Sequence, residues 1–185
     1  MKEFKVSNKY SINCLVFSKN CIWASSEGSI KVLHETGEAV KEFNVGGTNM
    51  CIVKEYVWVC SNNEILICCS NNLTIEYTVE IQNDYPHLIK LIEDQVWVAT
   101  TLNNILVYDC SSREKLFQID NAHEYRINDI ITAGDYIWSA SDDETIAIWT
   151  KQVKRNFYFI FYFFIFLFFI LKLIGKAQKT YYSKM

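Results

Sequence analysis

Short apolar runs alternate with polar turn residues along the first 150 residues, and four tryptophans mark the pattern. Trp23, Trp58, Trp97 and Trp138 follow one another at intervals of 35, 39 and 41 residues. A Ser or Thr lies three residues after each Trp, and an Ile that opens a second apolar run follows it by seven or eight residues. Apolar runs of five to eight residues without helical period, bounded by Asn, Asp, Ser and Gly, predict β-strands. The pattern therefore predicts an all-β protein built from a repeated unit.

Aligning the four Trp segments predicts three units of four strands and a fourth unit of three. A period near 40 residues made of short strands is typical of a β-propeller, whose four-stranded blades bury both faces against neighbours. The expected fold class is all-β, an incomplete β-propeller of about four antiparallel four-stranded blades. The predicted strands are Ile12–Phe17, Cys21–Ser25, Ile30–His34 and Ala39–Val45; Met50–Lys54, Tyr56–Cys60, Ile65–Cys69 and Ile75–Gln82; His87–Ile92, Gln95–Thr100, Ile105–Asp109 and Lys115–Asp120; and Ile127–Thr132, Tyr136–Ala140 and Ile146–Trp149.

The fourth unit resembles a repeat of the WD family. Ala122-His123 occupies the place of the family's Gly-His, the segment Ser141 to Thr145 matches its Ser-x-Asp-x-Thr turn, and Trp149-Thr150 stands for its Trp-Asp. The resemblance implies a structural hydrogen-bond tetrad. By position its members are His123, Ser139, Asp143 and Trp149.

The resemblance covers about residues 8 to 150 and is weaker in the first three units. None of these has a His fifteen residues before its Trp, and Gly28 and Asn63 stand where the turn Asp belongs in the first two. The Val-Trp-Val form of the second strand is also similar to blades attached to inositol-polyphosphate 5-phosphatases and Rho exchange factors, and to bacterial sensor propellers. A WD ring closes with about seven blades. The chain is therefore expected to be a fragment, a truncated product, or a partner that completes its ring with another chain.

The composition changes abruptly after Thr150, which predicts two parts, residues 1–150 and 151–185. Phe157–Ile174 is apolar except for Lys172, and basic residues flank it on both sides. A helix of this length spans about 27 Å, close to the ~30 Å hydrocarbon core of a bilayer. Three interpretations stay open for the tail: a membrane-spanning helix, the outer strand of the fourth unit, or a gene-model artefact from translated AT-rich sequence.

Charge and cysteine content limit the function classes. Residues 1–150 carry all 21 acidic residues but only 11 of the 18 basic ones. An acidic body lacks the basic face that nucleic-acid binding requires. The seven cysteines include no C-x-x-C pair, which predicts free thiols in a reducing compartment and a cytoplasmic location. Anchoring through the hydrophobic tail is the alternative location.

The sequence predicts no catalytic, cofactor-binding or metal-binding residues, and hence no enzyme. His34 and His87 have no partners at ligand spacing, and the acids Asp142 to Glu144 form a turn rather than a calcium loop. No nucleophile motif or glycine-rich phosphate loop occurs.

The remaining candidate for function is a surface of loops, which we expect to bind a protein partner. Its candidate residues lie in the loops that enter the third and fourth units and in the last turn: Tyr85, His87, Glu124, Tyr125, Arg126 and Asp142. The favoured hypothesis is a non-catalytic interaction scaffold. The alternatives are the amino-terminal propeller of a larger signalling enzyme, such as an inositol-polyphosphate phosphatase or a Rho regulator, and a tail-anchored membrane protein.

Overall fold

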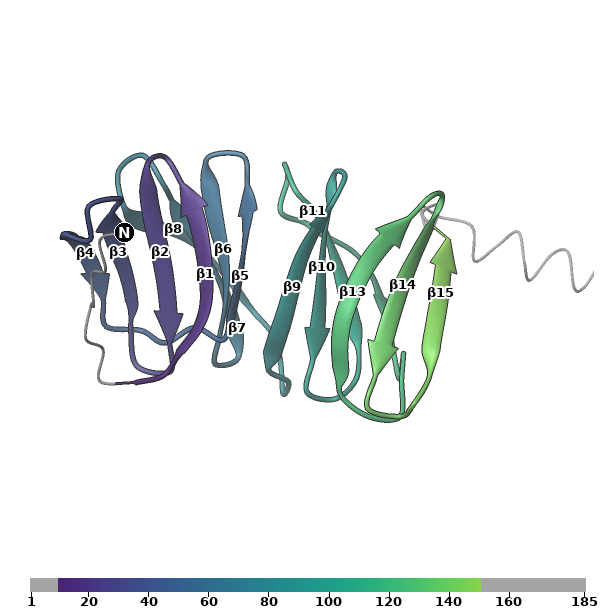
Figure 1. The fold of residues 1–185 in the computed structure, drawn as a ribbon. Coiled ribbons are helices and arrows are strands. Elements are labelled where there is room, and N and C mark those ends of the chain that lie inside the picture. The colour runs from purple at the N-terminus through teal and green to yellow at the C-terminus, as the bar shows by residue number, and fades with distance from the viewer. Residues whose placement is uncertain (1–9, 151–185) are drawn as a thin grey trace, which may run out of the picture. The chain divides into compact units, whose positions relative to one another are not determined.

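The computed structural model describes residues 10–150, which form antiparallel β-sheets in chain order (Figure 1). The all-β fold class is confirmed, and the predicted strand ends agree with the observed ones to within two residues. The sheets comprise β1 (Ile12–Ser18), β2 (Cys21–Ser26), β3 (Ile30–His34) and β4 (Ala39–Phe43); β5 (Asn49–Val53), β6 (Tyr56–Ser61), β7 (Glu64–Cys69) and β8 (Thr74–Glu80); β9 (Pro86–Ile92), β10 (Gln95–Thr100), β11 (Ile105–Asp109) and β12 (Lys115–Ile119); and β13 (Ile127–Ala133), β14 (Tyr136–Ser141) and β15 (Ile146–Thr150).

Tight turns between the strands use residues that tolerate positive φ. Lys19 and Asn20 have φ of 52° and 61°, which is the geometry of a two-residue type I′ hairpin turn. Asn62 and Asn103, in the turns between middle strands, have φ of 41° and 61°. The polar residues that separate the apolar runs in the sequence thus set where each strand ends.

Each sheet packs on the next through a layer that contains a tryptophan. Trp23 lies with residues of the second sheet, such as Val59, in one buried cluster. Trp58 contributes to the cluster between the second and third sheets, where its ring meets Tyr108 edge-on at 6.4 Å. Trp97 lies in the cluster between the third and fourth sheets. All three indoles are fully buried, so the Trp period of the sequence marks the spacing of the sheet interfaces.

Polar side chains on the first strands tie neighbouring sheets together. Asn13 Nδ2 donates to the Gly47 carbonyl at 3.2 Å, and Asn49 Oδ1 accepts from the Ile89 amide at 3.2 Å. His87 in β9 continues this series, because its Nε2 lies 2.7 Å from the carbonyl of Ile127 in β13. These bonds join the first strand of each sheet to the next sheet or to the loop that leads into it.

The sequence's expectations for the tail fall on residues that the structure does not describe. Between residues 10 and 150 there is no helix whose length and apolar character would let it cross a bilayer. The run Phe157–Ile174 and its three interpretations stay predictions.

Truncating a buried isoleucine should destabilise the stack far more than truncating an exposed one in the same sheet. Ile65 is fully buried, whereas Ile75 in β8 is 39% exposed. We expect Ile65→Ala to lower the free energy of unfolding by about 2–5 kcal/mol through lost transfer energy and a cavity. Ile75→Ala should cost less than about 1 kcal/mol. Urea unfolding measures both, and equal losses would contradict the assigned burial.

Candidate functional site

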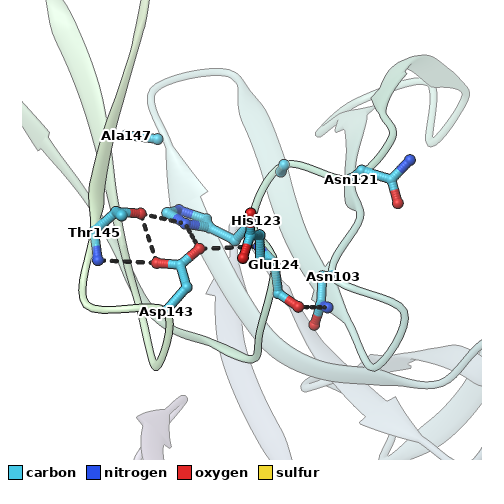
Figure 2. Close-up of a pocket in the computed structure, with 8 residues that line it drawn as sticks. Asn103, Asn121, His123, Glu124, Asp143, Thr145 and Ala147 are labelled. Carbon is cyan, nitrogen blue, oxygen red and sulfur yellow. Dashed lines mark hydrogen bonds and ion pairs between the residues drawn. The ribbon is translucent and has the colours of Figure 1, made fainter.

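A hydrogen-bonded network centred on His123 joins the loop before β13 to β14, to the β14–β15 turn and to β15. Figure 2 shows the contacts of His123 with Asp143 and Thr145. His123 lies in the loop between β12 and β13, and its Nδ1 is 2.9 Å from Asp143 Oδ2 in the turn between β14 and β15. Its Nε2 lies 2.7 Å from Ser139 Oγ on β14. Trp149 Nε1 on β15 donates to the same Ser139 oxygen at 2.9 Å. The structure thus brings His123, Ser139, Asp143 and Trp149 together in one chain of contacts.

The chemistry of the four groups fixes the direction of each hydrogen bond. The ionised Asp143 can only accept, so Nδ1 of His123 carries the proton. In the neutral imidazole Nε2 accepts from the Ser139 hydroxyl, whose oxygen accepts from the Trp149 indole. Every donor in the chain has an acceptor, and such fully satisfied buried networks rigidify the segments they join.

Asp143 holds the network together as a multiple acceptor. Besides His123, its Oδ2 accepts from the Glu124 amide at 2.9 Å, and its Oδ1 accepts from the Thr145 amide at 2.9 Å and the Thr145 hydroxyl at 2.5 Å. Burial raises the pKa of this carboxyl, but the bonds from Thr145, Glu124 and His123 outweigh that effect and hold the pKa well below its ordinary range. The side chain therefore stays ionised at neutral pH.

The order Asp143, His123, Ser139 is also that of a hydrolase triad, but the serine is not placed for attack. Ser139 is only 1% exposed, and its oxygen already accepts from Trp149. A nucleophile must reach a substrate carbonyl. The open hollow beside the network, about 580 Å³, is lined by His123, Asp143, Thr145 and neighbouring loop residues, and Ser139 is not among its lining residues. The arrangement fits a structural role for these four residues.

A second buried carboxylate, Asp84, organises the loop before the third sheet. It is 5% exposed, and its Oδ1 accepts from the Tyr85 amide at 2.8 Å, the Leu102 amide at 3.0 Å and the Thr101 hydroxyl at 3.0 Å. Asn104 Nδ2 donates to its Oδ2 at 3.2 Å. Burial raises the pKa of Asp84, but these and other hydrogen bonds outweigh that effect and lower it.

Sequence reasoning missed Asp84 because the acid lies in the loop before the third sheet, whereas in the fourth sheet the acid lies in the turn. In the fourth sheet the loop supplies the donor His123 and the turn supplies the acid Asp143. In the third sheet the loop supplies the acid Asp84 and the turn supplies the donors Thr101 and Asn104. The signal for Asp84 in the sequence is a turn rich in polar donors, Thr100, Thr101, Asn103 and Asn104, that faces an acidic residue in the preceding loop.

Loops and turns of the two sheets form one continuous edge. The turn between β10 and β11 bonds back to Asp84 and forward to the next loop, where Ala122 N donates to Asn103 O at 2.9 Å. Asn103 Nδ2 donates to the Glu124 carbonyl at 2.9 Å (Figure 2). Asn104 Oδ1 accepts from the Asn121 amide at 3.0 Å. We call this surface the loop edge, comprising residues 83–85, 101–104, 121–126 and 142–144.

The structure places the predicted interaction residues in two different settings. Tyr85 and Tyr125 are 56% and 61% exposed on the loop edge, and Leu102, which the sequence did not single out, is 57% exposed there. Glu124, Arg126 and Asp142 are exposed there as well. Their backbones are fixed, since Asp142 N donates to Arg126 O at 3.0 Å and Ser141 Oγ to Tyr125 O at 3.1 Å.

His87 lies apart from those exposed side chains. It is half-buried within β9, and its Nε2 contacts the Ile127 carbonyl. Burial lowers the pKa of the His87 ring and so favours the neutral imidazole, although the bond to the Ile127 carbonyl acts in the opposite direction. The side chain therefore serves as a tie between two sheets.

Metal-ligating clusters and disulfides do not organise the described part of the chain. No group of three or more His, Cys, Asp or Glu side chains within residues 10–150 could hold a metal ion. All seven thiols are free, and burial raises the pKa of Cys51 and of Cys68 to about 12. These two thiols stay protonated and unreactive at neutral pH.

Removing the Ser139 hydroxyl should destabilise the fourth sheet. Ser139→Ala leaves the Trp149 indole N–H and His123 Nε2 without their partner in a buried site. We expect the free energy of unfolding to fall by about 1–3 kcal/mol. Ser111→Ala, at an exposed position between β11 and β12, is the matched control and should be near neutral. Chemical denaturation followed by Trp fluorescence measures both, and an unchanged Ser139→Ala midpoint would refute the network's contribution.

Acid should unfold the protein partly through Asp143. Its folded-state pKa lies below the unfolded-state value of about 4, so its stabilising contribution is present above about pH 4. That contribution is lost as the pH falls from there toward the folded-state pKa. We expect Asp143→Asn to be less stable than wild type at neutral pH, with a smaller further loss on acidification. Asp135→Asn, in the exposed β13–β14 turn, should keep the wild-type profile, and identical profiles for all three proteins would contradict the assignment.

Comparisons with known proteins agree with this architecture, although no protein-family model matches the chain. Over 149 residues the chain is 32% identical to the probable serine/threonine-protein kinase pats1 of Dictyostelium discoideum. That match covers 78% of this chain and 5% of the relative, so the chain spans a small part of the relative's length.

Solved structures resemble the described sheets more closely in shape than in sequence. The computationally designed Ika4 protein matches with a TM-score of 0.68 at 17% identity, over 78% of this chain and 93% of its own. The designed Ika8 protein matches with 0.66 at 17% identity, over 76% of this chain and 46% of its own. The WD40 repeats of RRP9 match with 0.66 at 14% identity, over 78% of this chain and 52% of theirs. The described residues therefore have the fold of consecutive blades of a WD40 β-propeller.

Proposed function

We propose that the chain is a non-catalytic propeller module that binds a protein partner through its loop edge. The observation that carries the proposal is the combination, on that edge, of exposed apolar side chains and immobilised backbone. Tyr85, Leu102 and Tyr125 are each more than half exposed. Asp84 and Asp143, both in buried networks, hold the loops and turns beneath them.

The rigidity of the loop edge matters for affinity. Ordering a mobile loop costs free energy when a partner binds, so a loop already fixed by hydrogen bonds binds with less loss. Tyrosine is enriched at interface hot spots because it offers a large contact area with few rotatable bonds. Glu124, Arg126 and Asp142 are exposed near Tyr125, so a complementary partner surface carries both basic and acidic residues at its rim.

The same networks support a binding role over a catalytic one. The His123 and Asp143 side chains already hydrogen-bond to each other and to neighbouring groups, and the Ser139 hydroxyl is buried. We also propose a cytoplasmic location, which the seven free thiols support, because such thiols persist in a reducing compartment.

A second candidate function follows from the relative. We infer that the blades could form a region of a larger multidomain protein, because the pats1 match covers 5% of that protein. In that case the loop edge would recruit partners to domains elsewhere in the polypeptide. Membrane anchoring through Phe157–Ile174 is a further proposal that rests on the apolar sequence of that run.

Removing the two exposed tyrosines should weaken partner binding without affecting the fold. The experiment compares proteins enriched from cells by tagged wild type, by Tyr85→Ala/Tyr125→Ala and by Tyr77→Ala. Tyr77 is 44% exposed on β8, away from the loop edge, and serves as the matched control. We expect a partner retained by wild type and the control, with at least about ten-fold weaker binding to the double variant. A partner that binds all three equally, or folded wild type without a partner, would overturn the proposal.

A further inference from the structure

Two sheet faces in the described part of the chain leave large apolar side chains exposed at positions that are buried in the other sheets. We define the front face as the side of β13–β15 that carries Trp138, Ile146 and Ile148. We define the rear face as the side of β1 and β2 that carries Leu15 and Phe17. Inside residues 10–150, each front-type face of one sheet is covered by the rear-type face of the next.

The front face of the fourth sheet is the clearer case. Ser139 and Trp149 point toward the third sheet, so the alternation of side chains along a strand places Trp138, Ile146 and Ile148 on the opposite side. Ile146 is 65% exposed and Ile148 is 54% exposed. The residues at the same two positions in the other sheets are all fully buried: Ile30, Ile65 and Ile105 for the first, and Val32, Ile67 and Val107 for the second.

The rear face of the first sheet shows the same contrast. Leu15 pairs with Ala24, the residue after Trp23, and is 63% exposed. Phe17 beside it is 57% exposed. The residues that pair with the position after Trp in the other sheets are Met50, Ile89 and Ile130, with exposures of 4%, 1% and 1%. Both faces therefore carry side chains suited to an interface that the described residues of one chain do not complete.

We propose that a second copy of this chain covers both faces. The front face of each copy packs on the rear face of the other, so that two chains join through two equivalent contacts. Each contact repeats the type of interface found three times within the chain, with an indole and two branched side chains against a Leu15-type residue. A partner of unrelated fold would have to reproduce this strand spacing, whereas a second copy already has it.

The number of copies follows from the geometry of propellers. A front-to-rear contact is heterologous, and it either closes into a ring or extends without limit. Propellers close with about four to eight blades, so two copies reach the upper end of this range and three exceed it. The described sheets match 93% of the designed Ika4 chain and 46% of the designed Ika8 chain.

The test uses the full chain carrying two different tags, co-expressed and purified in mild detergent. Ile146→Glu disables the front face, Leu15→Glu disables the rear face, and Leu102→Glu on the loop edge is the matched control. Light scattering gives the mass of each complex, and sequential affinity purification reports whether both tags are present. Circular dichroism and Trp fluorescence establish that each variant is folded. We expect two chains for wild type and Leu102→Glu, and an increase of at least about ten-fold in the dissociation constant for each face variant.

Mixing the two face variants distinguishes this interface from any other association. A pair of Ile146→Glu copies, or of Leu15→Glu copies, has no undamaged contact. A mixed pair keeps one, because the intact front face of one copy meets the intact rear face of the other. We therefore expect mixed pairs to form more tightly than either variant alone and less tightly than wild type. Four outcomes would each overturn the proposal. Wild type could have the mass of a single chain, or form assemblies that grow with concentration. Neither face variant could affect association, as expected if the tail drives it, or mixing the two face variants could fail to restore association.

Discussion

Burial of both faces of every sheet is the constraint on which the structure depends. A lone four-stranded sheet with apolar residues on both sides exposes both sides to water, and only stacking removes both from solvent. The indoles of Trp23, Trp58 and Trp97 fill the space between successive sheets and are fully buried. Because each sheet repeats this solution, the tryptophans recur at near-regular intervals. Within residues 10–150, the first and fourth sheets each have a neighbouring sheet on one side.

The polar networks solve a second problem, which is how loops at the edge of such a stack are held. The fourth sheet uses the ring of His123 with the carboxylate of Asp143, and the third uses Asp84 with hydroxyl and amide donors from the facing turn. Both arrangements join the loop before a sheet to the turn between its middle strands. The chemical need, a buried acceptor surrounded by several donors, is the same although the residues differ.

The sequence predicts the strands well because their signal is local. Alternation of apolar runs with Asn- and Gly-containing turns reflects backbone preferences that act within a few residues, as at Asn62 and Asn103. Asp84 and His87 were harder to interpret, because their roles depend on residues brought near by sheet pairing. Asp84 bonds to residues in the turn after β10, and His87 bonds across to Ile127, 40 positions away. The exposure of Leu102 likewise depends on how the turn is held.

The two kinds of surface are separate in both position and chemistry, which allows them to serve different partners. The loop edge offers tyrosines on backbone fixed by buried carboxylates, with the exposed charges of Glu124, Arg126 and Asp142 near them. The front and rear faces offer aliphatic and aromatic side chains on regular strands, so a partner is selected chiefly by the spacing of the sheet. A surface of the first kind suits a folded protein that presents complementary side chains. A surface of the second kind suits only another sheet of the same twist and strand separation, because flat apolar layers pack well only when their side chains interdigitate.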